Sequence, residues 1–118
     1  MFLFLEHRGT KMTLTAYTIC TYIFVMRYEW DEHKNQINRR KHGVSFELAC
    51  KVFDDPLHLT KFDRTVDGEE RWHALGNALG IVLLLVVHTY QLQDGDEVIR
   101  IISARKATSH ERRQYEDE

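Results

Sequence analysis

The sequence has few cysteines and little net charge, and both features limit what the protein can be. Its two cysteines, Cys20 and Cys50, show no CxxC motif and no spacing typical of a metal site. Cys50 falls on the apolar side of an expected helix, which predicts a buried, reduced thiol and suits the cytoplasm. The net charge of −2 gives no global basic field for nucleic acid. Local patches must therefore decide what an anionic partner meets.

Several common catalytic motifs are also missing. The sequence contains no GxGxxG, GxxxxGK[ST], HExxH or GxSxG motif. It has no Cys/His cluster for zinc and no pair of carboxylates in an apolar setting for glycoside chemistry. The seven histidines are scattered without ligand spacing. We therefore expect a site that uses neither a metal ion nor another cofactor.

The apolar segment Leu14–Met26 is shorter than the about 20 residues that a membrane-spanning helix needs. It follows three basic residues and loosely mimics a signal peptide, but no clear cleavage site follows it. We expect residues 1–25 to be an extension, produced by an upstream mis-assigned start codon or poorly ordered, and Met26 to be the natural first residue. Two alternatives remain: an extra strand over residues 17–28, because of its β-branched and aromatic residues, and a membrane anchor.

The rest of the sequence is typical of one soluble domain. Its 118 residues, 43% hydrophobic and 29% charged, suffice to bury a core without disulfides or metal. A short strand is expected over residues 27–30, followed by a polar helix that Asp31 caps and Gly43 ends. Ser45 caps a second helix, in which apolar residues recur at the spacing of one buried face: Phe46, Ala49, Cys50 and Phe53.

Four strands are expected next, over residues 57–62, 71–75, 81–90 and 97–104. Short polar turns join them, which predicts an antiparallel meander, and the apolar run 81–90 predicts a central strand covered on both faces. Thr108 and Glu111 form the T-x-x-E capping box of a last helix. The expected fold class is α+β: two N-terminal helices, a four- to five-stranded antiparallel sheet and a C-terminal helix, with the helices covering one sheet face.

Arginines near the ends of the strands are the first candidates for a functional site. Arg71, Arg100 and Arg105 stand on neighbouring strands, where they can converge on one anion. A guanidinium is permanently charged and matches phosphate or carboxylate oxygens two at a time. A buried unpaired charge is costly, so Arg100 must reach solvent or a partner. The alternative to an anion site is a salt bridge to a nearby acid: Glu69, Glu70, Asp96 or Glu97.

An aromatic and a histidine residue are further candidates. His88 lies near the end of the central strand, and histidine transfers protons near neutral pH. A structural, hydrogen-bonded histidine is equally compatible with this position. Trp72 can stack on a nucleobase or pack in the core. In a regular strand, Trp72 and Arg71 point to opposite faces.

Basic residues form two runs along the sequence, over residues 34–41 and 100–113, with an acidic stretch at 54–70 between them. Lys41 and His42 end the first helix, where a cation can contact an anionic ligand or simply complement the helix dipole. Lys106 follows the last strand. All three are candidate contacts for an anionic partner.

Three segments together resemble a known family: YEWDEHKNQINRRKHGVSFELACKVFDDP, EERWHALG and RIISARKATSHERRQYE. From about Met26 to the C-terminus, the chain resembles the BrnT family of bacterial toxins of type II toxin–antitoxin pairs. The resemblance implies a fold like that of the RelE ribonucleases and an RNA endonuclease that blocks translation in the cytoplasm. It also implies a cognate antitoxin, BrnA, that neutralises the toxin in a heterotetramer. Operator DNA would then be contacted only through the antitoxin.

The resemblance also assigns residues. The family's Arg-Trp pair matches Arg71 and Trp72, and the arginines of its RIISAR strand match Arg100 and Arg105. Before the central strand, where the family often has an arginine, this sequence has Asn77. Stabilisation of the phosphate charge is then left to the other guanidiniums.

The implied chemistry is a metal-independent transesterification, in which the RNA 2′-hydroxyl attacks the neighbouring phosphate. The products are a 2′,3′-cyclic phosphate and a free 5′-hydroxyl. This reaction needs a base, an acid and stabilisation of charge on phosphorus. The arginines would supply the stabilisation, His88 the proton transfer and Trp72 a stacking surface.

Two other functions remain compatible with the same segments. A toxin of this kind of fold can bind and inhibit gyrase without cleaving RNA. A member of the family can also have lost its activity and serve only as the partner of its antitoxin and operon.

Overall fold

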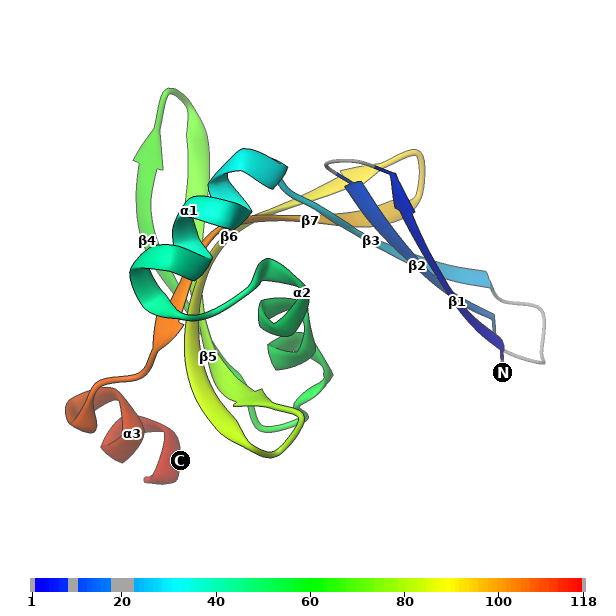
Figure 1. Ribbon diagram of the computed structural model, residues 1–118. Coiled ribbons are helices and arrows are strands. Elements are labelled where there is room, and N and C mark those ends of the chain that lie inside the picture. Colours follow the sequence, from blue (N-terminus) through cyan, green and yellow to red (C-terminus); the bar gives the residue numbers. More distant parts are fainter. Residues whose placement is uncertain (1, 9–10, 18–22, 118) are drawn as a thin grey trace.

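A computed structural model gives the fold. It describes the backbone of residues 2–8, 11–17 and 23–117, and the side chains of residues 26–117. The elements follow one another along the chain as shown in Figure 1. They are β1 (Phe2–Arg8), β2 (Lys11–Tyr17), β3 (Ile23–Glu29), α1 (Glu32–His42), α2 (Phe46–Ala49), the 3-10 helix η1 (Cys50–Asp54), β4 (Leu59–Val66), β5 (Glu69–Ala78), β6 (Val82–Gln93), β7 (Asp96–Lys106) and α3 (Ser109–Glu116).

The strands form one sheet in the order β1-β2-β3-β7-β6-β5-β4. Strands β4 to β7 form the predicted antiparallel meander. Strand β3, however, pairs with β7 in parallel. The prediction of a purely antiparallel sheet of four to five strands is therefore only partly confirmed. The parallel pair is possible because the helices α1, α2 and η1 and the strands β4 to β6 separate β3 from β7 along the chain, and parallel neighbours need such a long connection.

The N-terminal strands extend the sheet beyond β3. β1 and β2 pair in antiparallel fashion, and β2 pairs with β3 in the same way. The expectation that the natural chain starts at Met26, and that residues 1–25 are an extension, stays a prediction. Among the described residues, no helix is long and apolar enough to cross a membrane.

The predicted helix ends are confirmed where local chemistry fixes them. The Asp31 side chain accepts hydrogen bonds from two backbone N–H groups of the first turn of α1, and Gly43 ends the helix with φ 70°. Ser45 caps α2, but this helix changes into η1 after Ala49 instead of continuing as an α-helix. A 3-10 turn is common at a helix end. Thr108 and Glu111 form the predicted capping box of α3.

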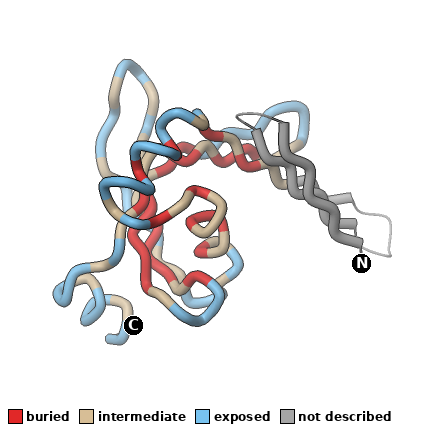
Figure 2. The backbone as a smooth tube through the Cα atoms, viewed as in Figure 1, coloured by how far each residue is buried: buried red, intermediate tan, exposed pale blue. Residues whose placement is uncertain are grey.

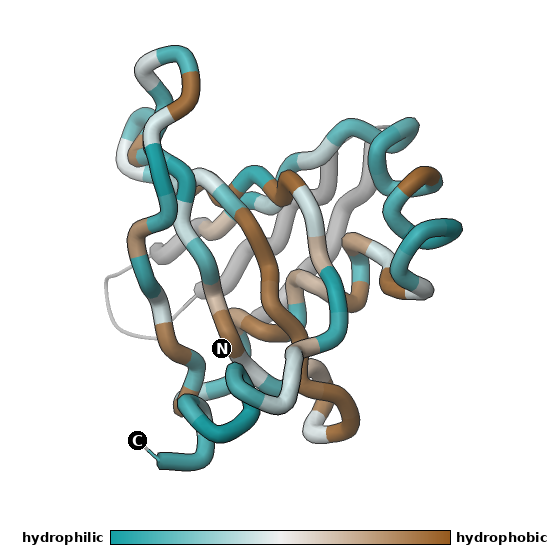
Figure 3. The backbone as a smooth tube through the Cα atoms, turned by 90° about the vertical axis from the view of Figure 1, so that its left-hand side faces the viewer, coloured by the Kyte–Doolittle hydropathy of each residue, from teal (hydrophilic) through white to brown (hydrophobic). Residues whose placement is uncertain are grey.

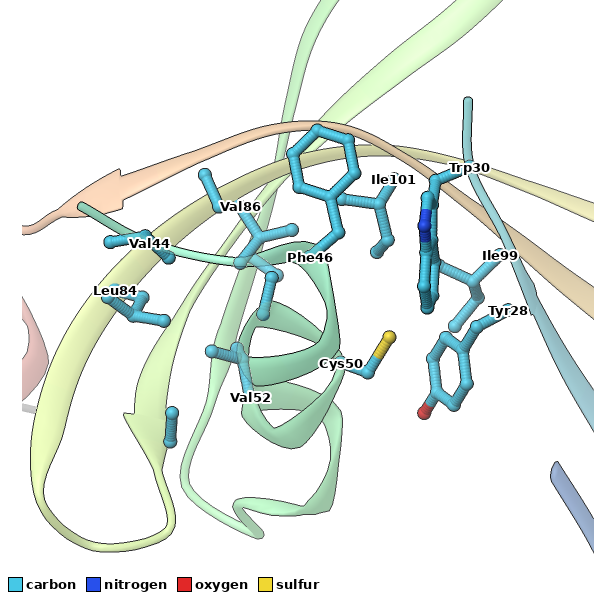
Figure 4. Packing of buried hydrophobic residues seen from close by; sticks show 14 residues of the cluster. Tyr28, Trp30, Val44, Phe46, Cys50, Val52, Leu84, Val86, Ile99 and Ile101 are labelled. Carbon is cyan, nitrogen blue, oxygen red and sulfur yellow. The ribbon is translucent and has the colours of Figure 1, made fainter. Parts of the chain in front are cut away.

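The main core lies between one face of the sheet and the helices α1, α2 and η1; this face is called the helix face. Figure 4 shows Phe46 and Cys50 of the helical layer among side chains of β6 and β7. The rings of Trp30 and Phe46 meet edge to face at 6.4 Å. Cys50 is a buried free thiol, as predicted. Cys20 lies outside the described residues. Figure 2 shows that the buried backbone follows α2 and the middle of the sheet.

Helix α1 is polar, yet it packs through two buried asparagines. The side-chain Oδ1 of Asn35 accepts a hydrogen bond from the N–H of Phe46, at 2.8 Å. The side-chain Nδ2 of Asn38 donates to the carbonyls of Val44 and Ala104, at 2.9 and 2.8 Å. The Ala104 N–H in turn donates to Oδ1 of Asn38, at 3.2 Å. These bonds join α1 to β7 without a wide apolar contact.

The opposite side of the sheet, called the outer face, carries α3 and a second, smaller core. Leu75, Leu83 and Leu85 are buried there, and Tyr115 of α3 packs against them. Helix α3 therefore lies across the sheet from α1 and α2 (Figure 1), so the prediction that all helices cover one face is wrong. The prediction that the central strand β6 is covered on both faces is confirmed. A long hydrophobic stretch through the middle of the sheet is visible in Figure 3.

Candidate functional site

Strand register gathers the three predicted arginines on the outer face. Residues opposite each other in an antiparallel pair point to the same face, as do alternate residues of one strand, roughly 7 Å apart. Arg71 lies two residues before His73 on β5 and therefore shares its face. Arg100 and Arg105 lie five residues apart on β7 and face the same way because the pairing of β6 with β7 shifts register between Val87 and His88. The pairs that establish this face are Leu75↔Leu85, His73↔Val87, Val87↔Ser103, Thr89↔Arg100 and Leu85↔Arg105.

Two of these arginines are already bound to carboxylates. Arg100 forms an ion pair with Glu69 of β5, which is the alternative that the sequence left open. Arg105 makes two hydrogen bonds with Glu111 of α3, at 2.8 and 2.9 Å. The hydrogen bond from Arg105 lowers the pKa of Glu111 to about 2. An incoming phosphate would have to compete with Glu69 for Arg100 and with Glu111 for Arg105.

Arg71 differs from the other two. Within the described residues it forms no ion pair, whereas Arg100 and Arg105 each form one. Its Nε atom is buried without a hydrogen-bond partner, as is the Nε of Arg100. A buried guanidinium nitrogen without a partner is costly, and such groups often mark a place where a ligand completes the bonding. Of the three guanidiniums, that of Arg71 is therefore best placed to bind an added anion.

A cleft of about 790 Å³ lies beside these residues, between α3 and the outer face. On the sheet side it exposes Lys61 and His73, which face each other across β4 and β5. His73 also lies 3.4 Å from the carboxylate of Asp63. On the helix side, His110 lines the cleft. The residues of this cleft, called the α3 cleft, are Leu59, Thr60, Lys61, His73, Leu75, Leu85, His110, Glu111, Gln114 and Asp117.

His73 was not among the residues singled out from the sequence, although the signal was present. The segment RWH places His73 two residues after Arg71, so strand alternation puts both on one face. Its neighbour Asp63 could not be found in this way, because the contact depends on the bulge in the pairing of β4 with β5 between Phe62 and Arg64.

His88 and Trp72 lie on the other side of the sheet. They pair with each other across β5 and β6, and His88 pairs with the core residue Ile101. One phosphate cannot contact both these residues and the outer-face arginines. Burial lowers the pKa of His88 to about 4, so this imidazole is neutral at pH 7. It therefore lacks the acidic imidazolium proton that a histidine general acid gives up.

The helix face holds a pocket of about 410 Å³ between η1 and the sheet. It is called the helix-face pocket, and its residues are Met26, Phe53, His58, Thr60, Glu70, Trp72, His88, Tyr90, Glu97 and Ile99. Lys41 and His42 end α1, which also packs on this side. Lys106 pairs with the core residue Leu84 and so faces the same side. These three predicted basic contacts therefore belong to the helix-face side, whereas the three arginines lie on the outer face.

Asn77, which stands where the family often has an arginine, has a structural role. Its side chain donates to the hydroxyl of Tyr115 at 3.2 Å, and its backbone N–H donates to Asp55 at 2.8 Å. The Tyr115 hydroxyl donates to the same Asp55 carboxylate at 2.7 Å. This network fastens α3 to the turn between η1 and β4. Among the described residues, no three His, Cys, Asp or Glu side chains are grouped so that they could hold a metal ion.

Comparison with known proteins identifies the family. The model of the family described as "Ribonuclease toxin, BrnT, of type II toxin-antitoxin system" matches residues 30–111. Among solved structures, the chain is similar to the ribonuclease toxin BrnT of Brucella abortus, with 28% sequence identity and a TM-score of 0.43. That match covers 68% of this chain and 94% of the other. No curated protein matches the sequence. Because the family model covers well over half of its length, the chain belongs to the BrnT family of ribonuclease toxins of type II toxin–antitoxin systems.

Proposed function

We propose that the protein is a metal-independent RNA endonuclease, and that RNA binds to the outer face along the α3 cleft. One observation carries this assignment of the surface. The outer face combines a guanidinium without a carboxylate partner, Arg71, with a carboxylate-supported imidazole, His73, beside an open cleft. RNA as the substrate follows from the family.

In the proposed reaction the RNA 2′-hydroxyl attacks the adjacent phosphorus, and the 5′-oxygen of the next nucleotide leaves. His73 and His110 line the α3 cleft from the sheet and from the helix. One can accept the proton of the 2′-hydroxyl and the other can protonate the leaving oxygen. Arg71 and Lys61 supply positive charge for the negative charge that develops on the phosphate oxygens. The products are a 2′,3′-cyclic phosphate and a 5′-hydroxyl.

Arg100 and Arg105 have different parts in this proposal. Arg100 binds phosphate after exchanging Glu69 for it, because that ion pair is partly open to water, with 41% of the Arg100 side chain exposed. Arg105 is a positioning residue, since its two bonds to Glu111 hold α3 beside the cleft. Trp72 and His88 stay outside this site because they lie on the helix face.

RNA cleavage by the purified protein in EDTA tests the proposal. We expect Arg71→Ala and His73→Gln each to lower the cleavage rate at least about 100-fold with the fold unchanged. Arg40→Ala is the matched control, because Arg40 is an exposed arginine on α1 and should leave the rate unchanged. Mass spectrometry of the fragments should show the cyclic phosphate. Full activity of Arg71→Ala would show that the catalytic site does not lie on the outer face.

The partner assignments extend the same proposal. The family implies an antitoxin, and we propose a BrnA-like protein that neutralises the toxin in a cytoplasmic heterotetramer and alone contacts operator DNA. We also propose that synthesis starts at Met26. Native mass spectrometry of the co-expressed pair gives the stoichiometry. Expression from Met26, with and without the neighbouring gene, gives the effect on protein synthesis.

A non-catalytic role is the second candidate, and one observation favours it. Two of the three family arginines, Arg100 and Arg105, are neutralised by carboxylates of this chain. A protein that only partners its antitoxin, or that binds gyrase, needs no free guanidinium. Intact RNA after expression of the toxin alone, without growth arrest, would support the partner role. DNA damage signalling without RNA loss would support gyrase binding.

A further inference from the structure

The helix-face pocket contains aromatic rings and carboxylates but no lysine or arginine. Trp72, Phe53 and Tyr90 supply the rings, and Glu70 and Glu97 supply the negative charge. Its volume of about 410 Å³ lies in the range of about 300–1,000 Å³ that ligand pockets occupy. Neither the RNA cleavage proposed above nor the main core uses the open part of this pocket.

The rings of the pocket are held in fixed positions. Trp72 packs edge to face on Phe62 of the edge strand, with ring centroids 5.4 Å apart. Phe53 of η1 packs edge to face on His88, at 4.9 Å. The hydroxyl of Tyr90 donates to Glu97 at 2.8 Å, which fixes that carboxylate at the rim. The pocket is therefore preformed, and a ligand need not order these groups when it binds.

Its charge decides which ligand fits. Glu70 and Glu97 repel the phosphates of RNA. Burial keeps His88 of the lining neutral at pH 7, so this histidine adds no positive charge to the pocket. A cation is attracted both by the carboxylates and by the faces of aromatic rings. A planar guanidinium can stack on tryptophan while it bonds a carboxylate in its own plane.

We propose that the helix-face pocket is a docking site for an arginine side chain of a partner polypeptide, stacked on Trp72 and paired with Glu70 and Glu97. The binding surface for this partner lies on the helix face, opposite the surface proposed for RNA. The two proposals are independent, since the docking site requires no RNA cleavage and RNA cleavage requires no docking.

Titration of the ¹⁵N-labelled full-length protein with N-acetylarginine amide tests this site. The indole N–H signal of Trp72 should shift and saturate in the millimolar range, which is typical of a ligand this small. The buried indole of Trp30, which donates to Glu32 at 3.0 Å, should not shift. N-acetylcitrulline amide, which has nearly the same shape without the charge, should bind at least about 10-fold more weakly.

Variants separate the pocket from a general charge effect. The double substitution Glu70→Gln and Glu97→Gln should weaken arginine amide at least about 10-fold. Asp94→Asn removes an exposed carboxylate from the β6–β7 turn and should leave the affinity unchanged. Three outcomes would each overturn the proposal. The citrulline compound could bind as tightly as arginine amide, the Trp72 signal could fail to shift with arginine amide, or it could shift with uridine monophosphate instead of arginine amide.

Discussion

Replacing Asn38 by alanine should destabilise the protein strongly, although Asn38 belongs to a helix that looks entirely polar in sequence. Its side chain is 6% exposed and bonds to both backbone groups of Ala104 and to the carbonyl of Val44. Strand β3 pairs with β7 only from Glu97 to Arg100. Beyond Arg100, the Asn38 amide forms hydrogen bonds with the backbone of Ala104 that a neighbouring strand would otherwise form.

The expected loss follows from the groups left without partners. Alanine at position 38 leaves two buried carbonyls and one N–H unsatisfied, at about 1–2 kcal/mol each. The free energy of unfolding should therefore fall by about 3–6 kcal/mol, a large part of the about 5–15 kcal/mol of a typical domain. For a chain of this length, the melting temperature should fall by about 15 °C.

Urea unfolding followed by circular dichroism measures this change. Asn38→Asp should be at least as damaging at pH 7, because a carboxylate cannot donate to the carbonyls of Val44 and Ala104. Gln36→Ala is the matched control: Gln36 is exposed on the same helix, so its loss should stay within about 0.5 kcal/mol. A loss below about 1 kcal/mol for Asn38→Ala would refute the reasoning, since it would show that the amide carries no net stabilisation.

Three further predictions concern other elements. The lowered pKa of Glu111 means that its bond to Arg105 stabilises fully above the usual carboxyl pKa of 4.5 and is lost as the pH falls toward about 2. Between pH 5 and 2, the free energy of unfolding measured in urea should therefore fall by about 1 kcal/mol less in Glu111→Gln than in the unchanged protein, after screening by solvent. Gly76→Ala should cost about 1–3 kcal/mol by thermal denaturation, because the added Cβ would lie 2.8 Å from a side-chain carbon of the neighbouring turn. Glu69→Gln should tighten RNA binding several-fold in EDTA by freeing Arg100; an unchanged affinity would remove Arg100 from the RNA surface.

The features that sequence predicted well are fixed by neighbours along the chain. Asp31, Gly43, Ser45 and Thr108 all occupy the helix ends expected of them, because a cap depends only on the next few residues. The apolar run of β6 likewise predicts a strand that is buried on both faces, as the structure has it. The meander follows from short turns between strands. The likeness to the RelE fold stays a prediction.

The features that sequence did not predict depend on distant contacts. Nothing near β3 specifies a parallel partner far along the chain, and nothing in the polar sequence of α1 shows that Asn35 and Asn38 face inward. Alternation along β5 separated Arg71 from Trp72, as expected. It could not show that Arg100 would meet Glu69 or that Arg105 would meet Glu111, because each pair joins two elements. The side of the sheet that α3 covers was undetermined for the same reason.

The parallel pairing of β3 with β7 has a consequence during synthesis. The register joins Arg27 to Val98, so this contact closes a loop that contains most of the domain. Contacts of such wide separation form late, because the entropy of closing the loop is lost before the contact is gained. The ribosome makes β7 after every other strand of the sheet, and a nascent chain without it lacks both Arg100 and the strand that joins β3 to the meander. The assembled domain can therefore form only after translation has passed β7.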